Sequence, residues 1–228
     1  MTKSNPAARF PARDRSESGT DIRILDSAIA LFAERGFNEV SVRDIAEHAK
    51  ANPAAISYYF GAKEQLIKQA IRSVIGPLNE KRLASLDALE ASGKKASPED
   101  VVRAMIEPTV HACMGGDGPD RHYARVLVLT FALRQPFVDD VMSEQTDKVA
   151  TRVVMALQRA LPGTDRATMF WHYDFMIGAL SHILLDASRA YRLRRLSDGG
   201  ADTADPHAVI EHLVAFVTAG MTAKPPRL

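Results

Sequence analysis

The sequence predicts an all-α fold, with a small N-terminal helical domain followed by a larger C-terminal one. Apolar residues recur at intervals of three and four along most of the chain, which is the period of a helix with one buried face. Serine, asparagine and aspartate stand where these patterns begin, several of them followed by proline, and these residue types cap helices. No segment alternates apolar and polar residues between hairpin turns, as β-strands would.

The composition is that of a globular protein without a membrane partner. The chain has 228 residues, of which 46% are hydrophobic and 25% charged, enough for one or two packed domains. No apolar run approaches the ~20 residues that a membrane helix needs, and none near the start resembles a secretory signal. Cys113 is the single cysteine, which favours the reducing cytoplasm. The net charge of +1 excludes a uniformly basic protein and directs attention to local groups of cations.

Residues 1–19 are predicted to form a flexible N-terminal arm. They contain Arg9, Arg13 and Arg15 among proline, alanine, serine and glycine, with little apolar content. Two interpretations stay open for this arm. It reaches into a DNA minor groove, or it is a solvated tail without a specific contact.

Residues 41–60 predict two short helices separated by a tight turn. Ser41 is a suitable N-cap with Asp44 three residues later, a variant of the capping box. Asn52 caps the second helix, and Pro53 occupies its first turn, where a missing N–H is tolerated. Two helices joined in this way are typical of a helix-turn-helix motif, whose second helix enters the DNA major groove.

Several short segments between residues 20 and 75 carry a family resemblance. These segments are Ile24–Ala28, Leu31–Phe37, Ser41–Ala46, Ile56–Phe60 and Lys63–Leu66. In this order and spacing they resemble the DNA-binding domain of the TetR family of transcriptional regulators. The sequence departs from the family pattern at Lys50, where glycine is usual, and at Ser57, where an aromatic residue is usual. If Lys50 must be left-handed, its side chain costs on the order of 1 kcal/mol.

The resemblance and the docking geometry of the motif imply a set of DNA-contacting residues. The set is Ser41, Arg43, Pro53, Ala54, Ala55, Ser57, Tyr58, Tyr59 and Lys63. Arg43 suits bidentate contact with guanine, and the small apolar residues suit thymine methyl groups. Lys63 begins the next helix, where its charge and the free amides can hold a phosphate. Tyr59 has an alternative role in packing on the first helix, and Asn52 is expected to cap rather than read bases.

The region 76–228 is predicted to be a helical effector-binding and dimerisation domain. Gly76–Pro77 is expected to end or kink the fourth helix, because proline removes a helical hydrogen bond. Ser97 is expected to cap a later helix, with acidic residues in its first turn. The helices expected beyond residue 76 are 78–91, 97–114, 122–134, 136–161, 165–194 and 205–222.

The helix expected at 165–194 is apolar almost all round, which requires burial on more than one side. One side would face its own domain and the other a second subunit. The resemblance implies dimerisation through a four-helix bundle formed by this helix and the last one. The residues predicted at that interface are Tyr173, Leu180, Ile183, Leu184, Ala187, Val209, Leu213, Phe216 and Val217.

The resemblance also implies a small-molecule effector that binds among the C-terminal helices and changes the separation of the two recognition helices. The predicted lining residues are Met105, Thr109, Cys113, Leu127, Phe131, Met142, His172, Phe175 and Met176. Ordinary core packing is the alternative role for this set, because pockets are themselves mostly apolar. No basic cluster in these helices suggests a phosphorylated ligand, so a mostly apolar effector is expected. Whether it releases or promotes DNA binding stays open.

No pattern in the sequence indicates catalysis, a cofactor or a metal. The seven histidines are scattered without the spacing of a zinc or di-iron site. Gly115–Gly118 lacks the preceding strand and following lysine of a phosphate loop. Two functional classes stay open: a dimeric, ligand-responsive DNA-binding repressor, or a helical module that acts through a protein partner or hidden catalysis. The grouping of Arg43, Tyr58 and Lys63 favours the repressor, because a module without DNA has no use for it.

Overall fold

The computed structural model describes residues 19–114, 120–132, 136–188 and 192–223. Within these ranges every element is a helix, which confirms the all-α prediction. The helices are α1 (Thr20–Arg35), α2 (Val42–His48), α3 (Pro53–Phe60), α4 (Lys63–Ala91), α5 (Pro98–Met114), α6 (Asp120–Ala132), α7 (Pro136–Ala160), α8 (Arg166–Ser188), α9 (Arg192–Leu196) and α10 (Pro206–Thr222). Residues 1–18 of the predicted arm and the side chains of Phe131 and Ala187 lie outside what is described.

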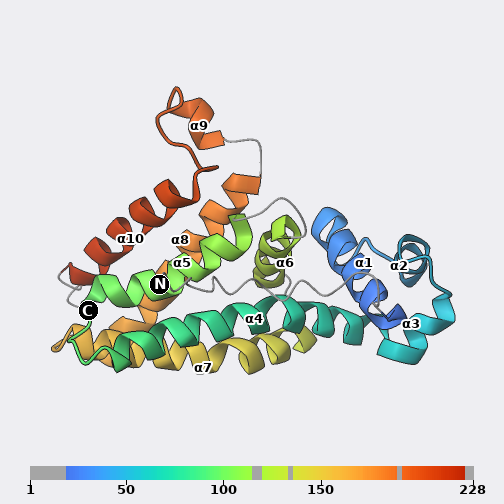
Figure 1. Ribbon diagram of the computed structural model, residues 1–228, viewed down its shortest axis with the longest axis horizontal. Helices are drawn as coiled ribbons and strands as arrows, with labels where there is room; N and C mark the ends of the chain where they lie inside the picture. The colour runs from blue at the N-terminus through green and yellow to red at the C-terminus, as the bar shows by residue number, and fades with distance from the viewer. Residues whose placement is uncertain (1–18, 115–119, 133–135, 189–191, 224–228) are drawn as a thin grey trace, which may run out of the picture.

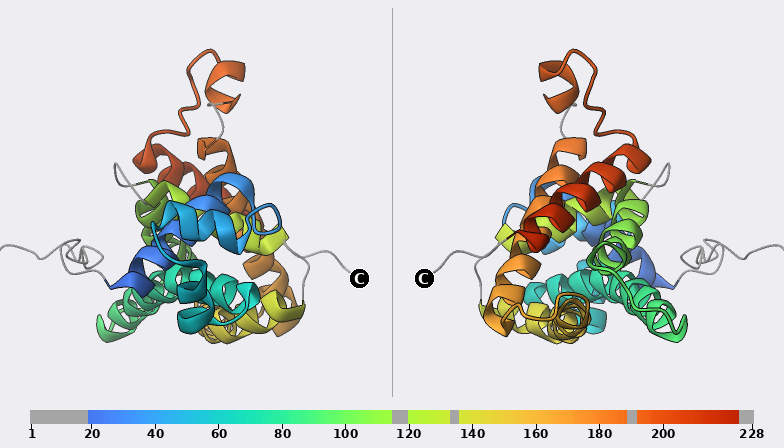
Figure 2. Two further views of the ribbon diagram at one scale, coloured as in Figure 1. Left: turned by 90° about the vertical axis from the view of Figure 1, so that its right-hand side faces the viewer. Right: turned by 90° about the vertical axis from the view of Figure 1, so that its left-hand side faces the viewer.

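The helices form two groups along the long axis of the molecule. Figure 1 shows α1, α2 and α3 gathered at one end, with α4 and α7 running side by side beneath the remaining helices. α1 packs against both α4 and α6, so these two helices connect the groups. α8 and α10 pack against each other on the side away from α3 (Figure 2).

The caps predicted for α2 and α3 are present. The Ser41 backbone N–H donates to the carboxylate of Asp44 at 2.7 Å, and the Asp44 N–H donates to the Ser41 hydroxyl oxygen at 3.1 Å. The Asn52 side chain accepts from the N–H of Ala54 at 2.9 Å. Ile45 and Ile56 are fully buried beneath these helices, so one face of each helix is held against the core. The opposite faces carry exposed side chains.

The turn between α2 and α3 places Lys50 in the left-handed region, at φ +50°. A side chain is disfavoured there because its Cβ crowds the backbone. We expect Lys50→Gly to raise the free energy of unfolding by about 0.5–1 kcal/mol, after the greater chain entropy of unfolded glycine is subtracted.

Urea denaturation of the two proteins measures this difference. Lys50→Ala is the matched control, because it removes the ammonium and keeps the Cβ. It should leave the stability nearly unchanged. A Lys50→Gly protein less stable than Lys50→Ala would show that the turn carries no strain.

The prediction that the fourth helix ends at Gly76–Pro77 is wrong. α4 continues from Lys63 to Ala91 with Pro77 inside it. Proline removes one backbone hydrogen bond, but neighbouring helices hold the segment on both sides of it. Ile75 and Leu78 are buried, and Asn79 donates a side-chain hydrogen bond to the carbonyl of Gln145 in α7. Packing therefore outweighs the local cost of the proline.

The structure bears on three further helix boundaries predicted beyond α4. Ser97 caps α5 as predicted, with its hydroxyl oxygen accepting from the Asp100 N–H at 3.1 Å. The segment expected as one helix at 165–194 is described as α8, Arg166–Ser188, and the short α9, Arg192–Leu196. Residues 189–191 between them lie outside the described ranges. Asp205 accepts from the N–H of His207 at 2.9 Å and so begins α10 where the sequence indicated.

Ion pairs on the surface join helices that are distant in sequence. Arg72 of α4 contacts Glu144 of α7 at 2.7 Å, and Arg103 of α5 contacts Glu211 of α10 at 2.6 Å. Hydrogen bonding from the arginine lowers the pKa of Glu144, and the same cause lowers the pKa of Glu211. These carboxylates therefore bind protons less readily in the folded protein than in the unfolded chain.

A carboxylate with a lowered pKa contributes stability above its unfolded pKa, and that contribution is lost as the pH falls through the folded value. We expect stability to be level above about pH 4.3, the pKa of free glutamate, and to fall at lower pH. Urea denaturation between neutral pH and about pH 3 measures the dependence. The double variant Glu144→Gln/Glu211→Gln should lose less stability on acidification. An equally steep loss in that variant would contradict the assignment to these pairs.

Candidate nucleic-acid interface and ligand site

The outward face of α3 carries polar and aromatic side chains beside a buried one. Ile56 is fully buried, whereas Tyr58 is 83% exposed and forms an edge-on ring contact with Tyr59 at 5.1 Å. Pro53 and Ala54 are also exposed, at the start of the helix. A short helix with Ile56 buried, Ala55 and Phe60 half-buried and its remaining side chains exposed has the form of a recognition helix.

The remaining residues predicted to contact DNA are not equivalent. Arg43 and Ser57 are exposed, as a base or phosphate contact requires, whereas Ala55 is half-buried and packs on the core. Ser41 is exposed, but its hydroxyl donates to the Asp44 carboxylate at 2.6 Å. Its cap hydrogen bonds therefore compete with any contact to DNA.

Lys63 lies in the first turn of α4, directly after the recognition helix. Its ammonium donates to the carbonyl of Asn38 at 3.4 Å, which holds the side chain beside α1 and α2. No side chain caps the start of α4, where Ala62 is the N-cap residue. The first amide groups of α4 and the ammonium of Lys63 are thus available to a phosphate.

The structure bears on the alternative roles of Asn52 and Tyr59. Asn52 is a helix cap, as expected. Tyr59 is exposed, and its ring lies 6.5 Å from that of Phe60, which is on the same helix and not on α1, so its position is compatible with DNA contact.

A cavity of about 160 Å³ lies among α4, α6, α7 and α8. The residues that line it are Ile75, Arg82, Leu127, Thr146, Tyr173, Asp174, Ile177, Leu180 and Ser181. It lies within the group of helices where an effector is expected, and two of the helices that form it, α4 and α6, also contact α1. A ligand in this cavity would therefore touch the same helices that support the recognition motif.

The predicted effector residues only partly coincide with this cavity. Leu127 lines it, while Met105, Thr109, Cys113 and Met176 are buried in the surrounding core. Met142 and His172 are half-buried without lining it. Phe175 is 63% exposed on α8 and does not line this cavity, because it points outward from the helix.

Sequence reasoning missed Arg82, which is 5% exposed in the wall of this cavity. Its Nε and one terminal nitrogen donate to the Thr109 hydroxyl oxygen at 3.1 and 2.9 Å, and the other donates to the Asn79 side-chain oxygen at 3.0 Å. Burial lowers the pKa of Arg82. A buried cation in an otherwise mostly apolar cavity qualifies the expectation of a purely apolar effector.

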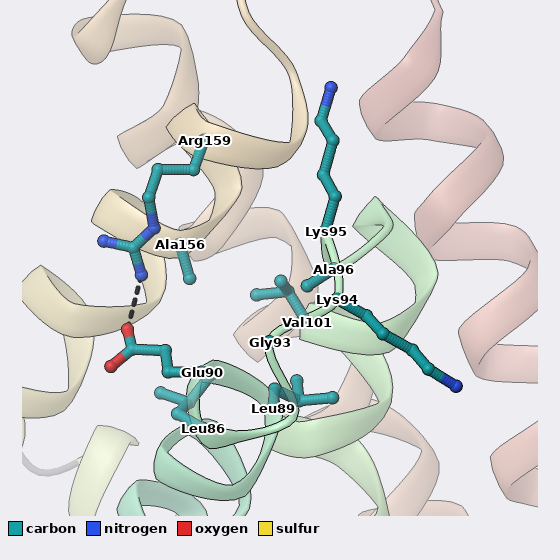
Figure 3. Close-up of a pocket in the computed structure, with 10 residues that line it drawn as sticks. All are labelled: Leu86, Leu89, Glu90, Gly93, Lys94, Lys95, Ala96, Val101, Ala156 and Arg159. Atoms are coloured by element: carbon teal, nitrogen blue, oxygen red, sulfur yellow. Dashed lines mark hydrogen bonds and ion pairs between the residues drawn. The ribbon is translucent and has the colours of Figure 1, made fainter.

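A second, larger cavity lies where α4 ends and α5 begins, with a volume of about 300 Å³ (Figure 3). Apolar side chains line much of this cavity, and two lysines are also among its lining residues. Lys94 and Lys95 extend away from the cavity in Figure 3, and Arg159 is engaged with the carboxylate of Glu90. It therefore offers no cation directed at a ligand.

The exposed faces of α8 and α10 carry large aromatic side chains. Trp171 and Phe175 are 61% and 63% exposed on α8, with ring centroids 5.8 Å apart, and Phe216 is 72% exposed on α10. Small residues continue each face, with Gly178 on α8 and Ala219 on α10 both exposed. We call these five residues, on the exposed faces of α8 and α10, the aromatic face.

The residues predicted at the dimer interface lie largely on the inner sides of α8 and α10. Of the predicted residues, Phe216 alone is exposed among those whose side chains are described. Those that are buried or partly buried in the protomer are Tyr173, Leu180, Ile183, Leu184, Val209, Leu213 and Val217. Their apolar spacing reflects packing of α8 and α10 onto their own domain, because the inner face of such a helix is also apolar.

Two structural surveys of the described residues concern other classes of site. No group of histidine, cysteine, aspartate and glutamate residues in the described ranges is placed to hold a metal ion. None of the described helices combines the length and the apolar content that crossing a membrane requires.

Curated relatives match part of this chain. The transcriptional regulator BetI of Rhizobium meliloti (strain 1021) is 34% identical over 89 residues, covering 39% of this chain and 41% of the relative. The transcriptional repressor KstR2 of Rhodococcus jostii (strain RHA1) is 38% identical over 69 residues, covering 30% of this chain and 34% of the relative. The alignments thus span less than half the length of these relatives.

Solved structures resemble the whole fold at low sequence identity. The regulator FadR of Bacillus subtilis, solved with stearoyl-CoA, is 16% identical with a TM-score of 0.64, covering 87% of this chain and 98% of that one. A TetR-family regulator of Bordetella parapertussis 12822 is 19% identical with a TM-score of 0.64, covering 88% and 94%. At these identities the likeness establishes the fold.

Two family models match the chain. The model for bacterial regulatory proteins of the tetR family matches residues 24–70, which include α2 and α3. The model for the C-terminal domain of tetracyclin repressor-like proteins matches residues 103–220, just over half of the 228 residues. With the helix-turn-helix geometry and the helical C-terminal region described above, these matches establish that the chain belongs to the TetR family of bacterial transcriptional regulators.

Proposed function

We propose that this protein is a ligand-responsive repressor that binds a pseudo-palindromic operator as a homodimer. The observation that carries the proposal is the outward face of α3, where Tyr58 is the most exposed of the large hydrophobic side chains in the described residues. Arg43 lies on α2 and Lys63 on α4, the two helices that precede and follow α3 in contact with it. Together they provide a base-reading face and a phosphate contact, as a major-groove helix needs.

Dimerisation follows from the aromatic face. Monomeric proteins rarely expose several neighbouring large apolar side chains, and such patches mark interaction sites. The small residues beside these aromatics allow a second backbone to approach closely, as in a four-helix bundle. Because one recognition helix reads few bases, a twofold pair gains both affinity and a defined spacing of half-sites. A second copy of this chain is therefore the proposed occupant.

Effector control is proposed to pass through α4. This helix extends without a break from Lys63, beside the recognition helix, to Ala91, and it supplies Ile75 and Arg82 to the cavity of about 160 Å³. A ligand releases DNA only if it binds the DNA-free arrangement more tightly. A cavity bordered by the helices that also contact α1 provides that difference when its walls move. The stearoyl-CoA bound to the FadR neighbour shows that a protein of this fold holds a small molecule.

A mobility-shift titration tests the proposal. The DNA upstream of the protein's own gene is the first target, with an unrelated duplex of equal length as the control. We expect retention of the target in the presence of excess unrelated DNA, with affinity falling as salt is raised, because phosphate contacts release counterions. Equal binding to both duplexes at every salt concentration would contradict the proposal and favour a module that acts through a protein partner.

A further inference from the structure

We propose that the cavity among α4, α6, α7 and α8 binds a small carboxylate, with Arg82 holding its charge and apolar side chains enclosing its body. This inference deepens the proposed function and rests on it, since the carboxylate would be the effector. It concerns the cavity that Leu127 and Ile177 also line.

The first argument is the charge of Arg82. A buried cation is costly unless an anion pairs with it. Its hydrogen-bond partners, Thr109 and Asn79, are both neutral. Tyr173 and Cys113 are the titratable groups that influence it electrostatically, and both are neutral near pH 7 at their ordinary pKa values. Within the described part of the chain no carboxylate forms an ion pair with Arg82, so an anion is the missing partner.

Second, Arg82 has N–H groups left that can donate to a ligand. A guanidinium has more N–H groups than the bonds to Thr109 and Asn79 use. The Thr109 hydroxyl gives its own proton to the carbonyl of Met105 at 2.8 Å, so it serves Arg82 only as an acceptor. These contacts hold the planar guanidinium in one orientation in the cavity wall. A fixed guanidinium suits a carboxylate, whose two oxygens match its geometry.

The third argument is the lining of the cavity around Arg82. Ile75, Leu127 and Ile177 are apolar, and the Thr146 hydroxyl already donates to the carbonyl of Met142 at 2.8 Å. Asp174 is the other charged residue that lines the cavity, and it is exposed. Water therefore screens its charge, whereas the charge of Arg82 acts through a drier interior.

The size of the cavity limits the ligand. Its volume of about 160 Å³ is close to the ~150 Å³ of an engineered cavity that holds benzene in another protein. A single ring or a chain of about six carbons fits such a volume, with the carboxylate at the Arg82 end. The expected ligands are thus monocarboxylates of the size of benzoate or hexanoate.

Paired ligands test the charge without altering the protein. Benzoate and hexanoate are titrated into the full-length protein by calorimetry, and benzamide and hexanamide are the neutral counterparts. We expect saturable binding of at least one acid, and an affinity for its amide lower by about tenfold to a hundredfold, the effect of one charged hydrogen-bonded contact. No binding of either acid, or equal binding of acid and amide, would overturn the proposal.

Substitutions test whether Arg82 binds the carboxylate. Arg82→Met should lose about tenfold or more in carboxylate affinity, while Arg82→Lys, which keeps the charge, should lose less. Arg72→Met is the matched control on the same helix, because Arg72 is at the surface and pairs with Glu144. Ser181→Leu narrows the cavity and keeps Arg82, so it should also weaken binding if Arg82→Met fails to fold. Undiminished binding to Arg82→Met, or to Ser181→Leu, would overturn the proposal.

A mobility shift with the operator tests the repressor function separately from the carboxylate site. If the acids fail to bind a protein that still retains the operator, the carboxylate site is wrong and the repressor function stands. If an acid binds through Arg82 but no DNA is retained specifically, the site stands and the repressor function is wrong. If both hold, the acid should lower operator affinity in the wild type and not in Arg82→Met.

Discussion

The double variant Trp171→Glu/Phe175→Glu is expected to be a monomer that no longer retains operator DNA. Both side chains are exposed on α8 and contact each other, so they form one apolar projection of the aromatic face. Aromatic residues at the centre of an interface often contribute 2 kcal/mol or more each, roughly a thirtyfold change in affinity apiece. Burying two glutamates against a second copy adds a desolvation cost. Light scattering of the purified protein measures the mass directly.

Met155→Glu is the matched control for this experiment. Met155 is also an exposed large apolar side chain, but it lies on α7, outside the aromatic face. The control should keep the mass and DNA binding of the wild type. A double variant that remains dimeric would show that the dimer interface lies elsewhere. Wild-type protein that is monomeric would contradict the proposed dimer itself.

Arg43→Ala and Lys63→Ala are expected to weaken DNA binding in different ways. Arg43→Ala should cost about 1–3 kcal/mol on the preferred operator and relax the preference at one base position. Lys63→Ala should weaken binding to all sequences alike, because Lys63 is expected to contact a phosphate. It should also reduce the slope of log affinity against log salt concentration by about one. Competition binding against a set of singly substituted operators, at two salt concentrations, measures both effects.

Lys94→Ala controls for the loss of any positive charge. Lys94 is exposed beyond the end of α4 farthest from α3 (Figure 1), so its removal should leave operator binding unchanged. If Arg43→Ala loses the same affinity on every sequence, Arg43 contacts the backbone and not a base. If Lys63→Ala alters sequence preference, the assignment to phosphate is wrong.

The local structure around the recognition helix could be predicted from the sequence because short-range chemistry determines it. The hydrogen bonds of Ser41 with Asp44 and of Asn52 with Ala54 involve residues two or three positions apart. Such caps depend little on the rest of the fold. Lys50 likewise has the positive φ expected of a position where glycine is usual.

The proposed ligand site is harder to predict because it depends on packing between distant helices. Treating Gly76–Pro77 as a break divided α4 and hid its continuous buried face. With the helix intact, Arg82 falls on the same face as Ile71, Ile75 and Leu86, all of which are buried. The spacing of Arg82 among apolar residues on one helix face indicates a buried arginine. This pattern is visible only if the helix continues through the proline.

The interface residues show a different limit. An apolar stripe predicts that a helix face is buried but not which partner buries it. On α10, Leu213 packs into its own domain, whereas Phe216, three residues later, is exposed. On α8, Leu180 is buried and Phe175 is exposed. Which face of each helix is exposed depends on how the two helices dock on the remaining domain.

Selection of bound sequences from random duplex DNA tests the central claim, that two copies of α3 read a groove from a twofold pair. The selected sites, with the protein-to-DNA ratio measured on each, should contain two inverted half-sites whose centres lie about one helical turn apart, or a multiple of it. Two protomers should occupy each site. Enrichment of no sequence, or of a single unrepeated half-site held by one protomer, would contradict the claim.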